Sequence, residues 1–261
     1  MQNPLMDAKN NIQRSEMLQS LNTVAKKKLS KPQLQQFQQF IASAVHFHPD
    51  TEYLRRPVEA IFNSLWELLV FGTAAAEPVN GCSASVRVFN PDAETGDWHN
   101  RYTCIYINQI DMPFLVDSLR IVLNRRGLNI YTLQSNPIWA VRDDSGILQS
   151  TSADYKEGAQ REALISIEVD RHTESELLDL HRELMGVLDD VQVVVDSFDS
   201  MRGRVEELIA ELQSNAPESE ETQESLEFLR WIYNGYFTFT GCVEFALQEK
   251  RGQTVSGGGS R

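Results

Sequence analysis

Residues 102–127 read YTCIYINQIDMPFLVDSLRIVLNRRG, and this stretch decides the fold. Tyr102–Ile107 is rich in aromatic and β-branched residues, which is typical of a β-strand. Asp111–Arg126 follows with apolar residues at helical spacing; Pro113 suits the first turn of that helix, and Gly127 suits its end. A strand that leads directly into an amphipathic helix predicts an α+β architecture.

The flanking residues extend this pattern on both sides. Ser83–Phe89 alternates as a strand before it, and Thr173 opens a second helix through a capping box. Val191–Val195 is expected to be the last strand, and further strands are expected at 128–133, 138–141, 147–149 and 164–169, with a polar loop at 151–162. From residue 102 the order is βαββαβ, which predicts a ferredoxin-like antiparallel sheet with two helices on one face.

Helices are expected before and after this sheet. The N-terminal pattern predicts helices over 11–29, from Ser30 to Val45, and from Asp50 to Gly72, after a loose terminus at 1–10. Later segments predict helices at 198–212 and 218–233, a strand at 237–247 and a flexible glycine run at 257–259. We therefore expect a helical subdomain at 1–78, an α+β domain at 79–199, and a helical pair with the start of another α+β module at 200–261.

Composition narrows the class of protein. The 261 residues carry 24 basic and 37 acidic side chains, a net charge of 24 − 37 = −13, which argues against a nucleic-acid partner. No apolar run is long enough to span a membrane. Three widely spaced cysteines favour a reducing compartment, so a cytoplasmic protein is expected. Eight acids between Glu206 and Glu227 favour a solvated helical face, with an acidic docking surface as the alternative.

Recognisable catalytic motifs are absent from the sequence. There is no glycine-rich dinucleotide or phosphate loop, and His46 and His48 lack the further ligands that a metal needs. Cys104 falls within a strand and is expected to be a small buried apolar residue. We therefore nominate no catalytic residue, no cofactor-binding residue and no metal ligand.

One turn is a candidate for an effector or an interface. It contains Asp111, Met112, Pro113, Phe114 and Leu115, between the strand and the helix. Backbone N–H groups at a helix start could bind a ligand carboxylate. The alternative is that Asp111 caps the helix while Phe114 and Leu115 fill the core, and the residues alone favour this structural role.

The chain resembles the N-terminal end of the large bacterial NAD-specific glutamate dehydrogenases over most of residues 20–261. The resemblance rests on VRVFNPD at 86–92, DMPFLVDS at 111–118, LNRRGL at 123–128, FLRW at 228–231, FTF at 237–239 and Gly241. It implies that residues 79–199 form an ACT-like domain, and that NAD and the chemistry lie further along a longer enzyme. That enzyme would oxidise L-glutamate to 2-oxoglutarate and ammonium in amino-acid catabolism.

The resemblance also implies how such a fragment would work. It would be inactive itself and act through allosteric regulation or assembly, with the rest of the polypeptide, a homo-oligomer and a possible amino-acid effector as partners. ACT domains that bind amino acids usually have Gly where Phe114 stands, which weakens the case for an effector at this turn.

Other functions remain open at this point. The main alternative is a stand-alone ferredoxin-like module that senses amino acids or binds proteins. An acylphosphatase-like enzyme would need an Arg in the turn 108–114, which has none. An RNA-binding sheet could stack bases on Tyr102 and Tyr106, but the acidic charge opposes it.

Overall fold

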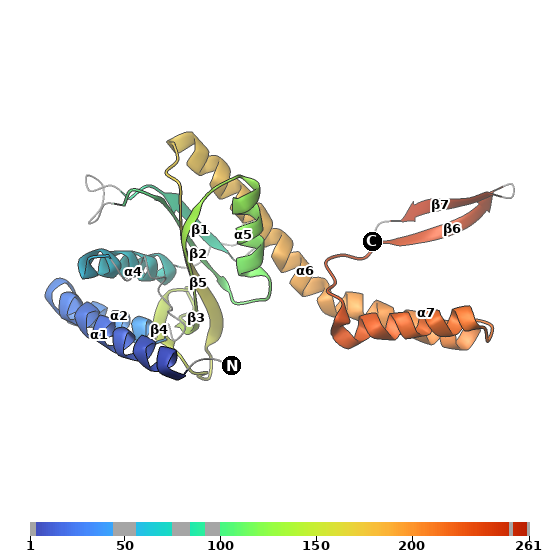
Figure 1. Ribbon diagram of the computed structural model, residues 1–261, viewed down its shortest axis with the longest axis horizontal. Coiled ribbons are helices and arrows are strands. Elements are labelled where there is room, and N and C mark those ends of the chain that lie inside the picture. The colour runs from blue at the N-terminus through green and yellow to red at the C-terminus, as the bar shows by residue number, and fades with distance from the viewer. Residues whose placement is uncertain (1–3, 44–55, 75–83, 92–99, 251–252, 260–261) are drawn as a thin grey trace. The chain divides into compact units, whose positions relative to one another are not determined.

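The computed structural model describes residues 4–43, 56–74, 84–91, 100–250 and 253–259 (Figure 1). The chain divides into two compact units, Met1–Asp189 and Asp190–Arg261. The helix α6, Glu174–Asn215, begins in the first unit and ends in the second. His46, His48 and the expected helix start at Asp50 lie outside the described residues.

The first unit is built on one five-stranded sheet. Its strands are β1 (Ser85–Phe89), β2 (Thr103–Ile110), β3 (Ile130–Arg142), β4 (Leu148–Ser152) and β5 (Gln160–Val169). They are hydrogen-bonded in the order β1-β2-β5-β3-β4, and all neighbours are antiparallel. The predicted α+β class, with helices before and after the sheet, is confirmed.

The expected last strand is wrong, because Val191–Val195 lies within α6. Leu184, Leu188 and Val191 are all buried at helical spacing, and no Pro interrupts the segment 184–195. The buried apolar face of α6 therefore continues to Val191, the first residue of the expected strand. In the sheet, the place beside β2 is taken by β1 from the other end of the domain.

A single strand, β3, replaces the two shorter strands expected around Pro137. Pro137 pairs with Ala163 of β5, whereas β4 pairs only with residues 139–142 of β3. Pro137 therefore sits where β3 has a strand on one side, a position that tolerates a missing N–H. The segment 151–162, expected to be a polar loop, contains the end of β4 and the start of β5.

Helices cover both faces of this sheet (Figure 1). One face carries α5 (Leu115–Arg125) and the start of α6. The other carries α1 (Pro4–Lys28), α2 (Lys31–Ser43) and α4 (Val58–Thr73). The second group shares one hydrophobic core with the sheet, including Leu21, Phe37, Phe62, Leu68, Cys104, Tyr106, Ile138 and Leu164. The boundary expected at residue 78, between the helical subdomain and the α+β domain, thus lies inside the first unit. Autonomous folding of residues 1–78 stays a prediction.

Two expected capping boxes are confirmed. Gln33 Oε1 accepts a hydrogen bond from the backbone N–H of Ser30 at 3.0 Å, before α2. Glu176 Oε2 accepts from the backbone N–H of Thr173 at 2.7 Å, before α6. These local signals fix helix starts without help from the rest of the fold. The first helix departs from expectation, since α1 includes residues 4–10.

Buried charged pairs fix both ends of α4 to the sheet. Just before the helix, Arg56 donates to both oxygens of Glu168 in β5, at 2.7 and 2.5 Å. At its other end, Arg142 of β3 donates to the carbonyl of Gly72 at 2.9 Å and to both oxygens of Glu162 at 2.7 Å. The two glutamates are almost fully buried, and these bonds offset the free-energy cost of removing their carboxylates from water.

The second unit contains α7 (Glu220–Trp231), a π-helical turn at Ile232–Tyr236, and a hairpin of β6 (Glu244–Lys250) with β7 (Gln253–Gly259). The strand expected at 237–247 therefore begins only at Glu244, and the glycine run expected to be a loop is part of β7. All eight acids from Glu206 to Glu227 are exposed, as both a solvated face and an acidic docking surface require. Among the described residues, no helix is long and apolar enough to cross a membrane.

Candidate functional site

The turn between β2 and α5 holds the five residues singled out from the sequence. Asp111 and Met112 are half-buried, Pro113 and Phe114 are exposed, and Leu115 is in the core. Asp111 does not cap α5, because no side chain caps this helix start. Its Oδ2 instead accepts a hydrogen bond from Arg161 Nε at 2.7 Å, and its backbone N–H donates to the Arg161 carbonyl at 3.0 Å.

Phe114 has a left-handed backbone, with φ 71° and ψ −5°. Among the described residues it is the one non-glycine residue with positive φ. Its side chain is 41% exposed, so the expectation that it fills the core is wrong. The backbone shape that glycine would supply is thus kept by a phenylalanine, which leaves an aromatic ring at the surface.

The buried side of this turn carries an unpaired acceptor. Gln109 is 2% exposed, and its Nε2 donates to the Met112 sulfur at 3.9 Å. Its Oε1 is buried and has no hydrogen-bond partner. An amide oxygen in this state is costly, since it has lost water without a replacement.

Sequence reasoning missed the partner of Asp111. Arg161 lies 50 residues further along the chain, and only the pairing of β2 with β5 brings the two together. The Arg161 guanidinium also lies 5.9 Å from the ring centre of Trp139. No spacing in the sequence signals either contact.

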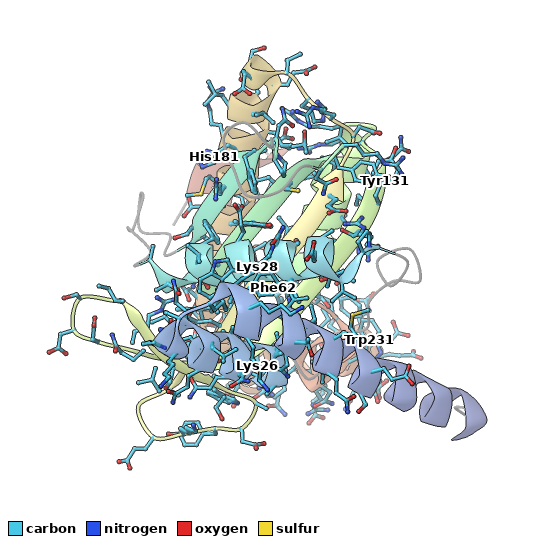
Figure 2. All side chains as sticks on the ribbon, turned by 90° about the vertical axis from the view of Figure 1, so that its left-hand side faces the viewer. Lys26, Lys28, Phe62, Tyr131, His181 and Trp231 are labelled. Atoms are coloured by element: carbon cyan, nitrogen blue, oxygen red, sulfur yellow. The ribbon has the colours of Figure 1, made fainter. Side chains whose placement is uncertain are left out.

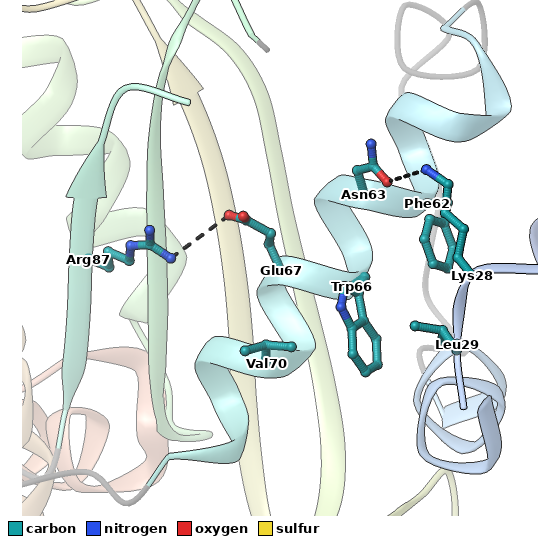
Figure 3. A pocket seen from close by; sticks show the side chains of 8 residues that line it. All are labelled: Lys28, Leu29, Phe62, Asn63, Trp66, Glu67, Val70 and Arg87. Atoms are coloured by element: carbon teal, nitrogen blue, oxygen red, sulfur yellow. Dashed lines mark hydrogen bonds and ion pairs between the residues drawn. The ribbon is translucent and has the colours of Figure 1, made fainter. Parts of the chain in front are cut away.

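A second candidate site is a groove between α1, α4 and β1, with a volume of about 530 Å³. We call it the α1–α4 groove. Its lining residues are Lys28, Leu29, Phe62, Asn63, Trp66, Glu67, Val70 and Arg87 (Figure 3). Lys28 lies over the ring of Phe62, 5.6 Å from its centre, where the end of α1 meets α4 (Figure 2). No sequence motif marks this groove, because its residues come from three separate segments.

Cys104 is buried on the face of the sheet that α4 covers, as expected. Burial raises the pKa of its thiol well above the usual range, and the nearby carboxylate of Glu168 raises that pKa further. A neutral thiol is a poor nucleophile, so this environment does not activate Cys104. The described residues contain no group of three or more His, Cys, Asp or Glu side chains that could hold a metal ion.

Comparison with known proteins identifies the family. Residues 40–184, more than half of the chain, match the family described as glutamate dehydrogenase, ACT1 domain. The chain belongs to the glutamate dehydrogenase ACT1 domain family. The ACT1 match covers the strand-to-helix turn and all five strands of the sheet.

Two curated relatives support this ACT1 assignment. The chain is 38% identical to the NAD-specific glutamate dehydrogenase of Halomonas elongata over an alignment of 174 residues, which covers 64% of this chain. It is 34% identical to the NAD-specific glutamate dehydrogenase of Pseudomonas aeruginosa over an alignment of 193 residues, which covers 72% of this chain. Each match covers 11% of the relative, so the ACT1 chain corresponds to a small part of these proteins. The resemblance drawn from the sequence is confirmed.

Proposed function

We propose that this chain is a non-catalytic N-terminal regulatory and assembly region of an NAD-dependent glutamate dehydrogenase. The observation that carries the proposal is the ACT1 match over residues 40–184, within a chain that covers 11% of its relatives. The complete enzyme would convert L-glutamate, NAD and water to 2-oxoglutarate, ammonium and NADH in the cytoplasm. NAD would bind elsewhere in that enzyme.

The sheet supports an ACT-like, ferredoxin-like assignment with one change. The strands β2, β3 and β5, with α5 and α6 between and after them, follow the first five elements of a βαββα(β) unit. The position of the missing last strand, beside the first strand of the unit, is filled by β1. We infer that the ACT-like unit of this family is completed from its N-terminal side.

The turn Asp111–Leu115 is proposed as an interface instead of a tight effector site. Pro113 and Phe114 are exposed, and Phe114 presents its aromatic ring at the surface of the turn. The Asp111 carboxylate already accepts from Arg161, which leaves it less available to a ligand ammonium. The partners proposed for this surface are the rest of the same polypeptide and further copies of it.

NADH formation tests whether this region is non-catalytic. The purified chain should produce no NADH from L-glutamate and NAD, while an intact glutamate dehydrogenase that contains this region produces it readily. Removal of the region from the intact enzyme should change its oligomer mass or its response to amino acids. NADH formation by the isolated chain would contradict the proposal, and so would a truncated enzyme with unchanged assembly and regulation.

One observation favours the alternative of a protein-interaction module. Phe228, Trp231 and Tyr236 are 60%, 45% and 70% exposed, and their rings stack in succession at 6.1 and 5.9 Å. Exposed aromatic groups of this kind are common in protein interfaces. Under this alternative, the chain would bind a protein partner without being joined to a dehydrogenase.

A further inference from the structure

We propose that the α1–α4 groove binds a free α-amino acid, with its head group between Arg87 and Glu67 and its side chain along Trp66 and Val70. The inference rests on the proposed regulatory function and gives it a ligand site separate from the Asp111 turn. Figure 3 shows the arrangement: Arg87 and Glu67 face each other at one end, and Lys28 and Asn63 meet at the other.

The pair of Arg87 and Glu67 matches the charges of an amino-acid head group. Arg87 Nη1 lies 3.8 Å from Glu67 Oε2, which is close enough for attraction but too far for a hydrogen bond. Glu67 Oε2 is buried and has no hydrogen-bond partner. The carboxylate therefore retains the capacity to accept a bond from a ligand ammonium, with a small movement of its side chain.

Arg87 is positioned to receive a carboxylate. The ring of Phe89 supports its guanidinium, with the central carbon 4.1 Å from the ring centre. This contact covers a face of the group and leaves the N–H edges for hydrogen bonds, which suit a carboxylate well. An α-carbon holds its carboxylate and ammonium side by side, as Arg87 and Glu67 hold the opposite charges.

The groove also has an apolar part next to its polar pairs. Trp66 and Val70 lie below the two polar pairs in Figure 3, and Val70 is 49% exposed. A ligand side chain placed here would remove apolar surface from water on both molecules. The volume of about 530 Å³ is within the range of roughly 300–1,000 Å³ that small-molecule sites occupy.

The end of the groove formed by Lys28 and Asn63 favours a ligand side chain with a hydrogen-bond acceptor. Lys28 Nζ donates to Asn63 Oδ1 at 3.3 Å, and Lys28 remains exposed. A ligand side chain that ends in an acceptor could bind there, whereas a cationic one would be repelled. Glu67 disfavours a simple anion such as phosphate, because its charge lies beside Arg87 in the same groove.

The test uses the complete 261-residue chain. Thermal melts with each of the twenty L-amino acids at millimolar concentration screen for ligands, since a bound ligand stabilises the folded state. The best one is then titrated by calorimetry against the native chain and against Arg87→Gln and Glu67→Gln. Arg182→Gln and Asp179→Asn are the matched controls, because that ion pair lies on the exposed surface of α6.

We expect at least one amino acid to raise the melting temperature by several degrees. Both groove variants should keep their circular dichroism spectra and bind it at least ~10-fold more weakly, as expected for loss of a charge-assisted bond. The two control variants should bind normally. Analogues of the same ligand that lack the ammonium or the carboxylate should also lose binding.

Two results would overturn the inference. One is a screen in which no amino acid shifts the melt or gives a calorimetric signal. The other is binding that survives both groove variants, and its loss in Asp111→Ala would move the site to the strand-to-helix turn. Neither result bears on NADH formation or enzyme assembly, so failure here is distinct from failure of the proposed function.

Discussion

Arg161 Nε donates a 2.7 Å hydrogen bond to Asp111 Oδ2, and this bond ties the strand-to-helix turn to β5. Asp111 therefore stabilises the start of α5 through the sheet instead of through the first turn of the helix. The side chains of Asp111 and Arg161 are 28% and 51% exposed, respectively, so solvent screens much of their attraction.

We expect Asp111→Ala to lower the free energy of unfolding by only ~0.5–1 kcal/mol. A double-mutant cycle of Asp111→Ala with Arg161→Ala, measured by urea unfolding, should give a coupling of about 0.5 kcal/mol. The same cycle on the more exposed pair Asp179 and Arg182 is the control and should give less. A coupling of zero for Asp111 and Arg161 would mean that the bond does not hold the turn.

The left-handed backbone at Phe114 predicts an unusual order of stability. Phe114→Gly and Phe114→Ala remove the same exposed ring, but only glycine relieves the conformation at φ 71°. We expect Phe114→Gly to be the more stable of the two by ~1 kcal/mol in urea unfolding.

Gly127 supplies the comparison for Phe114. It has φ 74° and an added Cβ would meet no atom within 4 Å, so Gly127→Ala reports backbone strain without a clash. It should lose ~1 kcal/mol. If Phe114→Ala proves as stable as Phe114→Gly, the turn does not keep its left-handed shape in solution.

The buried pair of Arg56 and Glu168 should be costly to break from one side. Arg56→Met leaves the Glu168 carboxylate buried without its guanidinium partner, although Asn100 Nδ2 still donates to Glu168 Oε1 at 2.7 Å. We expect a loss of about 2–4 kcal/mol, because an unpaired buried charge is unfavourable.

Replacement of both members is the informative control for this pair. The double variant Arg56→Met with Glu168→Met should be more stable than Arg56→Met alone, since no charge is left without its partner. Thermal and urea unfolding would both show this order. A double variant that is the least stable of the set would show that packing, and not charge, dominates at this position.

Cys104 predicts a dependence of stability on alkaline pH. Its pKa is raised by burial and then by Glu168, so the folded state keeps the thiol proton at a pH where the unfolded state has lost it. The folded state then binds more protons, and the stability contributed by this group is full below the unfolded pKa and falls as pH rises above it.

The measurement is the difference in unfolding free energy between the native chain and Cys104→Ala. This difference should shrink above about pH 8.5, by at most ~1.4 kcal/mol per pH unit. At neutral pH a thiol reagent should modify the exposed Cys242 quickly and leave Cys104 unreacted until the protein unfolds. Rapid native-state modification of Cys104 would contradict the neutral buried thiol.

Local sequence determined the elements whose signals lie within a few residues of one another. The capping boxes at Ser30 and Thr173 were readable because each needs only a partner three residues later. The strand and helix of 102–127 were readable because periodicity reports which faces are apolar. The family resemblance rested on such local strings as well, including DMPFLVDS at 111–118.

Tertiary structure decided what depends on distant partners. The valines at 191–195 suit a strand in isolation, yet the apolar stripe of α6 carries them into a helix. The place of β1 beside β2 and the bond from Arg161 to Asp111 join segments far apart in the chain. The contacts of Lys28 with Asn63 and of Arg87 with Glu67 do the same in the α1–α4 groove. Hydrophobic patterning shows which face of an element is buried, but it does not specify the partner that covers that face, because the hydrophobic effect is non-directional.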